Sequence, residues 1–368
     1  MNNKNFDVFF DCGSSKIRVG AFNKENKKNN FYIETSTFLT DATVNYELQK
    51  VISSIEENTQ EYLDDVNLMI DDKSISSIGI SISKKLGGSK IKKGDIQFLI
   101  QDAKQQVLKT YTNQNILHII IQNYKIDNIE YIFLPHDINC NLISLDILFI
   151  CVPKKTIEYY KEIFFKLDIS VNQFFCSSYA KSINYKNNFG SEENILFIDI
   201  GFNKTSIICY NKDKIIFLDI LPIGSNHITK DISKILEISW QDAENTKLYF
   251  DNDSIFMNQE KVSLKLVESI ISSRIDEILK LCTQSIKLNL KKFDDFKVIL
   301  IGEGSKIVNK KYMENISFLG DIDFFEESIE NICESGLKLS TGLNKQEVVM
   351  VPKKQIKQGF FEKLFLNF

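Results

Sequence analysis

The sequence has few histidines and no Cys-x-x-Cys motif. Its three histidines, His118, His136 and His227, stand far apart among the 368 residues. Zinc sites usually draw their ligands from closely spaced pairs of cysteine and histidine. We therefore expect no metal centre built from these residue types.

Long hydrophobic runs are also missing. None approaches the ~20 apolar residues that a helix needs to cross a bilayer, and residues 1–10 lack the charged-then-apolar pattern of a signal peptide. The seven cysteines, an odd number, lie mostly within apolar runs such as residues 147–152, where a free thiol packs as a small hydrophobic group. The sequence thus predicts a protein made and kept in the cytosol with reduced cysteines, free to lie on a membrane.

A concentrated basic surface is not evident either. The formal net charge is −4 and the lysines are spread through the whole chain, which argues against a nucleic-acid partner. With 43% hydrophobic and 26% charged residues, the composition is that of a globular protein. The length of 368 residues exceeds one domain of ~100–200 residues, so we expect at least two domains.

What the sequence does have is a long-range repeat. Residues 8–22 align without a gap on residues 196–210. Each segment has an apolar run that ends in aspartate, a turn at glycine, and a second apolar or β-branched run, which is the pattern of a β-hairpin. Two such hairpins predict two related lobes.

The paired hairpins carry groups suited to phosphate chemistry. Gly13 and Gly201 have no Cβ, so backbone N–H groups in these turns can approach a phosphate oxygen. Asp11 and Asp199 can hold the water shell of a Mg²⁺ ion, which prefers carboxylate and phosphate oxygens. Hydroxyl groups and a positive charge follow in the first turn, at Ser14, Ser15 and Lys16.

The remaining patterns alternate between strands and helices, which favours a doubly wound α/β architecture. Helical spacing is found at residues 48–55, 96–108, 156–166 and 262–290, and strand patterns at residues 75–82, 116–121, 145–152 and 298–301.

A third glycine-rich segment, Gly302, Glu303, Gly304 and Ser305, follows the strand predicted at residues 298–301. Glycines at a strand-to-helix turn let a flat base or ribose approach the backbone, and a helix N-terminus favours anions. An ordinary strand–helix connection has the same pattern. Alone, this segment is weak evidence for a nucleotide site, and it supports one only together with the two hairpins.

Together these motifs resemble those of the actin, Hsp70 and sugar-kinase superfamily. Residues 11–16 are similar to its first phosphate motif, residues 199–201 to its second, and residues 301–305 to its adenosine motif. The resemblance implies a two-lobed, actin-like (ribonuclease H-like) α/β fold that binds ATP and Mg²⁺ in the cleft between the lobes.

Within this superfamily the sequence is most similar to the bacterial cell-division family FtsA, over essentially the whole chain. Residues 117–127 resemble part of the IC subdomain specific to that family, and residues 221–247 follow the family's order into its IIB subdomain. Glu244 and Lys247 look like the residues that meet the ribose and adenine. The implied organisation is lobe I at residues 1–82 and 153–190, IC at 83–152, lobe II at 191–230 and 298–343, IIB at 231–297, a linker at 344–354 and a terminal helix at 355–368.

The second phosphate motif departs from the family pattern. Where the family has a run of glycines and a threonine after the position of Gly201, this chain has Phe202, Asn203 and Lys204, which crowds the backbone approach to a phosphate. Lys204 occupies the position that Lys16 holds in the first hairpin, and we expect its charge to compensate in part. We expect nucleotide binding with slow or absent hydrolysis. A residue that positions the attacking water is expected in residues 176–180, and no carboxylate stands out there as a base. No catalytic residue is therefore assigned.

The last residues form an amphipathic pattern. As a helix, residues 355–368 carry an apolar stripe, with lysines on or before the other face. Such a helix lies in a bilayer interface but is too short to cross it, although a helix docked on the protein's own core has the same pattern. The density of phenylalanine, the basic lead-in and the polar linker favour membrane binding, and the FtsA family also ends in such a helix. The stripe consists of Ile356, Phe360, Phe361, Leu364, Phe365 and Phe368.

The resemblance implies an adaptor that tethers filaments of the tubulin-like FtsZ to the inner face of the cytoplasmic membrane at the division site. It also implies self-association into filaments, contact with an anionic membrane surface and recruitment of downstream divisome proteins. In this family the IIB subdomain binds the C-terminal tail of FtsZ. Arg274 falls where that subdomain carries a tail-binding arginine, although a solvated helix charge is an equally good interpretation.

Other members of the superfamily remain as alternatives. A pilus-assembly platform of the PilM type shares the phosphate motifs and the IC insertion but is not expected to carry the amphipathic tail. A sugar or acetate kinase needs a catalytic aspartate and polar sugar contacts that the sequence does not place. An Hsp70-type chaperone is disfavoured, because too few residues follow Ser305 for a substrate-binding domain.

Overall fold

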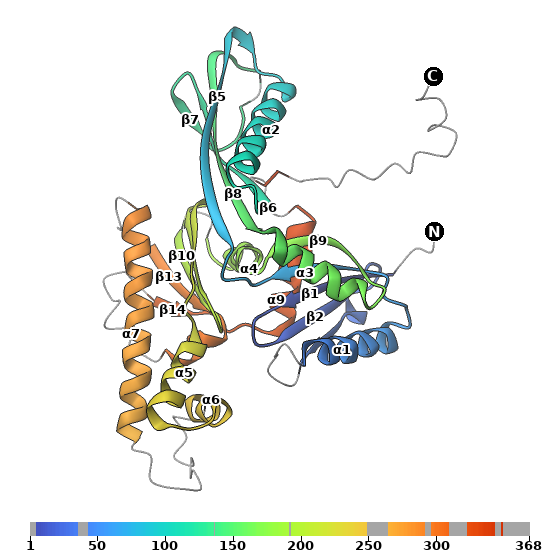
Figure 1. Cartoon of the computed structure of the whole chain (residues 1–368). Coiled ribbons are helices and arrows are strands. Elements are labelled where there is room, and N and C mark those ends of the chain that lie inside the picture. The colour runs from blue at the N-terminus through green and yellow to red at the C-terminus, as the bar shows by residue number, and fades with distance from the viewer. Residues whose placement is uncertain are drawn as a thin grey trace.

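The computed structural model describes residues 5–35, 43–135, 137–190, 193–248, 264–290, 296–308, 322–342 and 347–348. The predictions for His136, for most of the linker at 344–354 and for the terminal helix at 355–368 lie outside these residues. The described part contains one five-stranded sheet in each of two lobes and a four-stranded sheet that projects from them (Figure 1).

The first lobe is built on a sheet of strand order β3-β2-β1-β4-β9. β1 and β2 form the predicted antiparallel hairpin, and β1 also runs parallel to β4. Because helices cover both faces of the sheet, its central strands are long apolar runs. The strands are β1 (Phe6–Cys12), β2 (Ile17–Asn23), β3 (Phe31–Glu34), β4 (Asp65–Ile70) and β9 (Ser170–Cys176), accompanied by η1 (Lys27–Asn29), α1 (Val44–Thr59) and α3 (Lys154–Phe165).

The second lobe repeats this plan. Its sheet has the order β12-β11-β10-β13-β14, so a hairpin is again followed by two parallel strands. The repeat in the sequence therefore corresponds to the same hairpin in each lobe, as predicted. The elements are β10 (Asn194–Ile200), β11 (Thr205–Asn211), β12 (Lys214–Leu221), β13 (Phe296–Ile301), η2 (Glu303–Ile307) and β14 (Ile322–Phe324).

A separate small core belongs to the inserted subdomain, whose sheet has the order β5-β8-β6-β7. α2 packs on one face of this sheet and buries Leu99, Ala103 and Val107. The boundary predicted at residue 83 falls inside β5. The elements are β5 (Ser76–Lys90), α2 (Lys93–Thr110), β6 (Gln114–Ile126), β7 (Ile129–Tyr131) and β8 (Asn139–Pro153).

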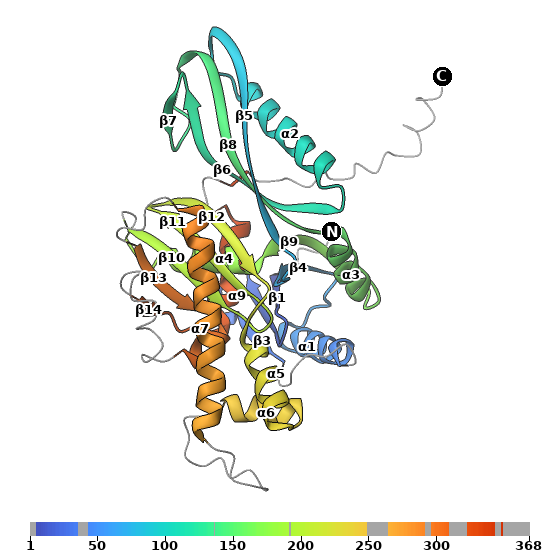
Figure 2. The same cartoon turned by 60° about the vertical axis from the view of Figure 1, so that its left-hand side comes forward.

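In the described part of the second lobe, helices extend away from the inserted subdomain: α5 (Ser225–Leu236), α6 (Trp240–Leu248) and α7 (Leu264–Asn289). The long α7 crosses one face of the sheet of the second lobe (Figure 2) and buries Val267, Ile271 and Ile275 against its core. Among the described residues, no helix combines the length and the apolar character needed to span a membrane.

Two helices lie in the interior between the lobes: α4 (Ser177–Lys186) and α9 (Ile329–Ser340). α4 contacts strands of both lobes, whereas α9 packs on the sheet of the first lobe. The sequence-based boundaries place α9 with the second lobe, at residues 298–343. Its close approach to the first sheet depends on Gly336, where a Cβ would overlap Phe9 and Met69.

Candidate functional site

The two hairpin turns face each other across one cleft. Because the lobes share a topology, both turns lie at the carboxyl end of a central strand, which is where open α/β sheets bind ligands. The turns and the segment after β13 line a common cavity of ≈ 50 Å³. Its lining comprises Asp11, Gly13, Ser14, Ser15, Arg18, Asp71, Ser177, Lys181, Asp199, Gly201, Phe202, Gly302, Glu303, Glu327 and Ile332.

Three glycines hold positions in this cleft that a side chain would fill. A Cβ on Gly13 would lie 2.9 Å from the carbonyl oxygen of Lys16, and one on Gly201 would lie 3.1 Å from that of Lys204. Gly302 has a φ of +88°, which L-residues rarely adopt, and a Cβ there would overlap the end of β10. The cleft is thus lined by backbone at these three points.

Asp11 is buried at the end of β1 and has two partners. Its Oδ1 accepts a hydrogen bond from Ser177 Oγ (2.5 Å), and its Oδ2 lies 3.4 Å from Arg18 Nη1. Arg18 also reaches the second lobe, where its Nη2 lies 3.2 Å from Glu303 Oε1. Burial by itself lowers the pKa of Arg18, but Asp11 and Glu303 raise it overall, so the guanidinium is held charged.

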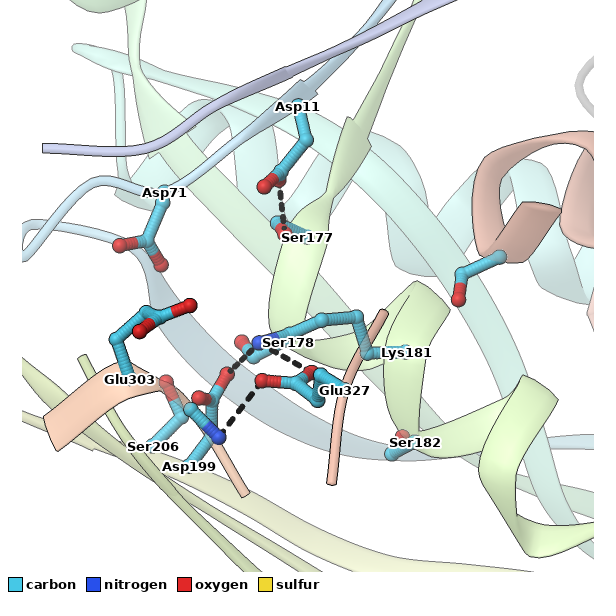
Figure 3. A network of polar contacts seen from close by, with 12 residues as sticks. Asp11, Asp71, Ser177, Ser178, Lys181, Ser182, Asp199, Ser206, Glu303 and Glu327 are labelled. Carbon is cyan, nitrogen blue, oxygen red and sulfur yellow. Dashed lines mark hydrogen bonds and ion pairs between the residues drawn. The ribbon is translucent and has the colours of Figure 1, made fainter. Parts of the chain in front are cut away.

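Asp199 has a buried cation of its own. Lys181 of α4 places Nζ 2.9 Å from Asp199 Oδ2 and 3.2 Å from Glu327 Oε1 (Figure 3). Glu327 also accepts hydrogen bonds from the backbone N–H of Gly302 (2.8 Å) and from the hydroxyl of Tyr185 (2.8 Å). Burial raises the pKa of Glu327, and Lys181 opposes this shift. The ammonium group thus bridges two carboxylates beside the second phosphate turn.

Lys204 does not line the cavity, and its side chain reaches the first lobe. Its Nζ lies 2.7 Å from Oδ1 of Asp71, which directly follows β4, and donates to the hydroxyls of Ser206 (2.6 Å) and Ser178 (3.3 Å). Burial by itself lowers the pKa of Lys204, but Asp71 raises it. In this conformation the charge of Lys204 is balanced by an ion pair between the lobes.

Glu244 and Lys247 lie behind Phe202. Lys247 Nζ is 2.7 Å from Glu244 Oε2, and the hydroxyl of Thr229 donates to the same carboxylate oxygen. The ammonium group is also 5.7 Å from the centroid of the Phe202 ring, which lines the cleft. Both charged residues are buried and neither lines the cavity. The structure therefore brings this pair close to the site but not into it.

The other predicted residues of the first turn lie at the cleft or its rim. Ser14 and Ser15 line the cavity. Lys16 points to Glu34, with Nζ 3.4 Å from Oε1, and its side chain is 31% exposed. The cation of the first turn thus lies at the surface, unlike the buried cation of the second.

The segment after β13 forms η2 at the edge of the cleft. Ser305 Oγ donates to the carbonyl oxygen of Gly302 (2.7 Å). A Cβ on Gly304 would overlap Ile200 at the end of β10. Close packing against β10 therefore fixes the backbone path of residues 302–305, which were predicted to contact adenosine. Glu303 of this segment lines the cleft.

Arg274 lies on α7, away from the cleft. Its Nε is 2.6 Å from Asp231 Oδ2 on α5, and its Nη1 is 2.5 Å from Glu277 Oε2. The side chain is 23% exposed. It therefore joins two helices of the predicted IIB subdomain and still reaches the surface.

Sequence reasoning missed the cations that the cleft itself contains. Arg18 is paired directly opposite Asp11 in the first hairpin, and opposed residues of an antiparallel pair point to the same face. The hairpin pattern could therefore have predicted that Arg18 lies beside Asp11. Lys181, Asp71 and Glu327 gave no local signal. They meet only because α4, β4 and the segment before α9 pack around the same cleft.

Within the part of the chain that the structure describes, no group of three His, Cys, Asp or Glu side chains is arranged to hold a metal ion. Asp11 and Asp199, predicted to hold Mg²⁺ through water, lie on opposite sides of the cleft, each beside a buried cation.

Comparisons with known proteins identify relatives of the chain. A family model described as cell division protein FtsA matches residues 196–318, and one described as the SHS2 domain inserted in FtsA matches residues 73–151. Together they match more than half of the 368 residues.

Curated sequences described as cell division protein FtsA are similar over longer stretches. One from Buchnera aphidicola subsp. Schizaphis graminum is 26% identical over 74% of this chain and 68% of its own length. One from Buchnera aphidicola subsp. Acyrthosiphon pisum is 24% identical over 86% of this chain and 85% of its own length. The match to a sequence from Agrobacterium fabrum, 23% identical, spans only 54% of that relative.

A solved structure described as the PilM–PilN type IV pilus biogenesis complex superposes with a TM-score of 0.64. The superposition covers 92% of this chain and 98% of the other at 12% identity. At this identity the likeness concerns the fold alone, and it agrees with the predicted two-lobed actin-like architecture with an inserted subdomain.

Proposed function

Since the chain belongs to the FtsA family of bacterial cell-division proteins, we propose that it binds ATP between its two lobes and tethers FtsZ filaments to the inner face of the cytoplasmic membrane. One observation carries the nucleotide part of this proposal. Two related Asp-x-Gly hairpins, one from each lobe, line a single cleft together with Gly302.

The cleft residues suit the phosphates of a nucleotide. Gly13, Gly201 and Gly302 line the cleft with backbone. In this conformation the N–H of Gly201 donates to the carbonyl oxygen of Lys204 and that of Gly302 to Glu327, so a phosphate would take over these donors. Arg18 and Lys181 supply positive charge beside the two turns. These cations are paired with protein carboxylates, and the cavity of ≈ 50 Å³ is smaller than a nucleotide. ATP binding therefore requires the lobes to separate and these cations to turn toward the phosphates.

A divalent cation fits the charge of this cleft. Among the described residues that line the cavity, carboxylates outnumber cations, so an anionic triphosphate alone adds to a negative excess. Mg²⁺ supplies the missing positive charge when it binds, and Asp11 and Asp199 would hold its water shell. The carboxylates are those of Asp11, Asp71, Asp199, Glu303 and Glu327, and the cations are those of Arg18 and Lys181.

Hydrolysis is slow or absent in this proposal. When Arg18 turns toward a nucleotide, Asp11 still accepts the hydrogen bond from Ser177 Oγ. A carboxylate in such a contact is a poor acceptor for a proton from attacking water. Phe202 and Lys204, which replace the small residues of the family pattern, reduce the backbone contacts available in the second turn.

The tethering role has two further parts. Arg274, joined to α5 through Asp231, lies on a surface that would receive the C-terminal tail of FtsZ. The apolar stripe predicted in residues 355–368 would lie in an anionic membrane surface. Self-association into filaments and contacts with downstream divisome proteins would place many copies at the division site, where the protein acts as a peripheral adaptor.

Co-sedimentation tests the proposal directly. Purified protein is mixed with FtsZ polymers and with anionic liposomes, with and without ATP and Mg²⁺. We expect it to pellet with each partner alone and to bring FtsZ polymers to the liposomes. The proposal fails if the protein stays in the supernatant with both partners.

A pilus-assembly platform is the second candidate, because the chain shares its fold with the PilM–PilN complex over 92% of its length. The two candidates differ in the partner. Binding of an FtsZ tail peptide supports the cell-division adaptor. Binding of a PilN-type pilus biogenesis protein, without binding of the FtsZ peptide, supports the platform.

A further inference from the structure

Residues 347–348 dock on the inserted subdomain. The N–H of Val348 donates to the carbonyl oxygen of Ile119 (2.8 Å), and Glu347 forms an antiparallel bridge with Ile120. β6 has β8 on one side, while on the other β7 pairs only with residues 124–126. The bridge therefore uses the part of the β6 edge that β7 leaves open.

The side chain of Glu347 points into the protein toward His118. Its Oε1 lies 2.6 Å from Nδ1 of His118, and the Tyr179 hydroxyl donates to its Oε2 (3.4 Å). His118 is 1% exposed, and its Nε2 accepts a hydrogen bond from the backbone N–H of Cys176 (2.9 Å). A backbone N–H can only donate, so Nε2 carries no proton and the proton lies on Nδ1, where it is donated to Glu347. The carboxylate thus fixes both the tautomer and the orientation of the ring.

His118 in turn holds the start of α4, which forms one wall of the cleft. Cys176 is the N-cap residue of α4. The next residue, Ser177, donates to Asp11 Oδ1 (2.5 Å), and one turn later Lys181 pairs with Asp199. One imidazole and one peptide unit therefore connect Glu347 with the first phosphate hairpin.

We propose that His118 and Glu347 are positioning residues of the nucleotide cleft. Docking of residues 347–348 on β6 fixes the imidazole, the imidazole fixes the N-terminus of α4, and α4 holds Ser177 against Asp11. The inference rests on the proposed nucleotide site. Because coupling between two sites is reciprocal, ATP strengthens the docking of residues 347–348 as much as docking strengthens ATP binding. The docked segment lies between α9 and the predicted terminal helix, so the cleft and the tail are linked.

The test compares Glu347→Ala with Glu347→Gln in the full-length protein. ATP affinity is measured by calorimetry, and amide hydrogen exchange is followed in a peptide that contains Cys176. We expect Glu347→Ala to exchange faster there and to bind ATP ~5-fold more weakly, the lower end of typical coupling between sites. Glu347→Gln should stay within about twofold of the wild type in both readouts, because its amide oxygen still accepts from Nδ1–H.

Two more variants separate positioning from local damage. Val348→Pro removes the N–H that donates to Ile119 and leaves the Glu347 side chain in place, so it should weaken ATP binding in the same direction. Glu162→Ala on α3 removes a carboxylate from an exposed ion pair with Lys166 and should change neither readout.

Wild-type ATP affinity and unchanged exchange around Cys176 in both Glu347→Ala and Val348→Pro would overturn the inference and leave the proposed function standing. If the wild type binds no ATP, the proposed nucleotide function is overturned. The exchange around Cys176 then still decides whether Glu347 positions α4, because that readout does not depend on ATP.

Discussion

At the scale of single residues, buried cations connect the two lobes across the cleft. Each cation is paired with at least one carboxylate, which holds it charged. An incoming nucleotide must therefore compete with protein carboxylates for the same cations. The contacts are Arg18 with Asp11 and Glu303, Lys181 with Asp199 and Glu327, and Lys204 with Asp71.

The pair of Lys204 and Asp71 gives a prediction about stability. Lys204→Met leaves a carboxylate that is only 16% exposed without its cation, and we expect the free energy of unfolding to fall by up to about 3–5 kcal/mol near neutral pH. Burial raises the pKa of Asp71 and Lys204 opposes that shift, so the pKa of Asp71 is higher still in the variant. At pH values above the ordinary pKa of aspartate, Asp71 still holds a proton in the folded variant but has lost it in the unfolded chain. The stability of the variant therefore falls as pH rises. Urea unfolding should therefore show a smaller loss near pH 5 than near pH 7.5.

A double variant is the control for this pair. Lys204→Met with Asp71→Asn removes both charges, so most of the lost stability should return. A loss that is equal at both pH values, or that the second substitution does not relieve, would contradict the ion pair.

Gly13 gives the prediction for the nucleotide site. In Gly13→Val the new side chain fills the turn where a phosphate oxygen would approach the backbone, and its Cβ already lies 2.9 Å from the carbonyl oxygen of Lys16. We expect no measurable ATP binding by calorimetry, and the same for Asp11→Ala. Gly79→Val on β5 is the matched control, because nothing lies within 4 Å of a Cβ there. ATP affinity equal to the wild type in both cleft variants would exclude this site.

At the scale of elements, the regular patterns were the predictable part. The repeated hairpin identified the central strands of both sheets, and the apolar spacing at residues 48–55 and 96–108 falls inside α1 and α2. These features can be predicted from a short segment, because the spacing of apolar residues along it sets which face of the helix or strand is buried. The hairpin also located Asp11 and Asp199, which line one cleft.

Tertiary packing decided what the sequence could not predict. α9 follows the second lobe in the chain but lies on the first sheet, because Gly336 allows it to approach Phe9. Lys204 sits where a phosphate contact was expected, yet Asp71 lies within 2.7 Å of its ammonium group. Each outcome depends on a partner from a distant segment, which no local pattern reveals.

α7 carries the prediction about partner binding. Arg274→Glu puts a negative charge beside Asp231 and Glu277, and we expect weaker binding of an FtsZ tail peptide with ATP affinity unchanged, because a charge reversal at a peptide site acts locally. Lys280→Glu makes the same change of charge on an exposed position of the same helix. Fluorescence anisotropy of a labelled peptide compares the two. Equal peptide affinity for Arg274→Glu and the wild type would place the interface elsewhere.

At the scale of the whole molecule, the inserted subdomain contacts both lobes. Its β6 lies beside β9 of the first lobe, while Gln122 Nε2 donates to the carbonyl oxygen of Ile216 (2.6 Å) and Lys214 Nζ donates to Asn123 Oδ1 (2.6 Å) in contacts with β12. A rotation of the lobes would therefore also shift the inserted sheet, together with the segment at residues 347–348 that is docked on β6.

Membrane attachment is the prediction that concerns the whole molecule, and it rests on residues 355–368, outside the described part. Deleting residues 359–368, or changing Phe361 and Phe365 to aspartate, should move the protein from liposomes to the soluble fraction. Full burial of an aromatic ring in the membrane contributes ~1.5–3 kcal/mol to binding, and each lysine near anionic lipid contributes about 1 kcal/mol. One half-buried helix therefore binds reversibly. Firm attachment needs many copies acting together. Phe165→Asp on α3 makes the same change at a residue that is 78% exposed, and flotation in a density gradient should not change. If the truncated protein still floats with the liposomes, the terminal helix packs on the protein's own core.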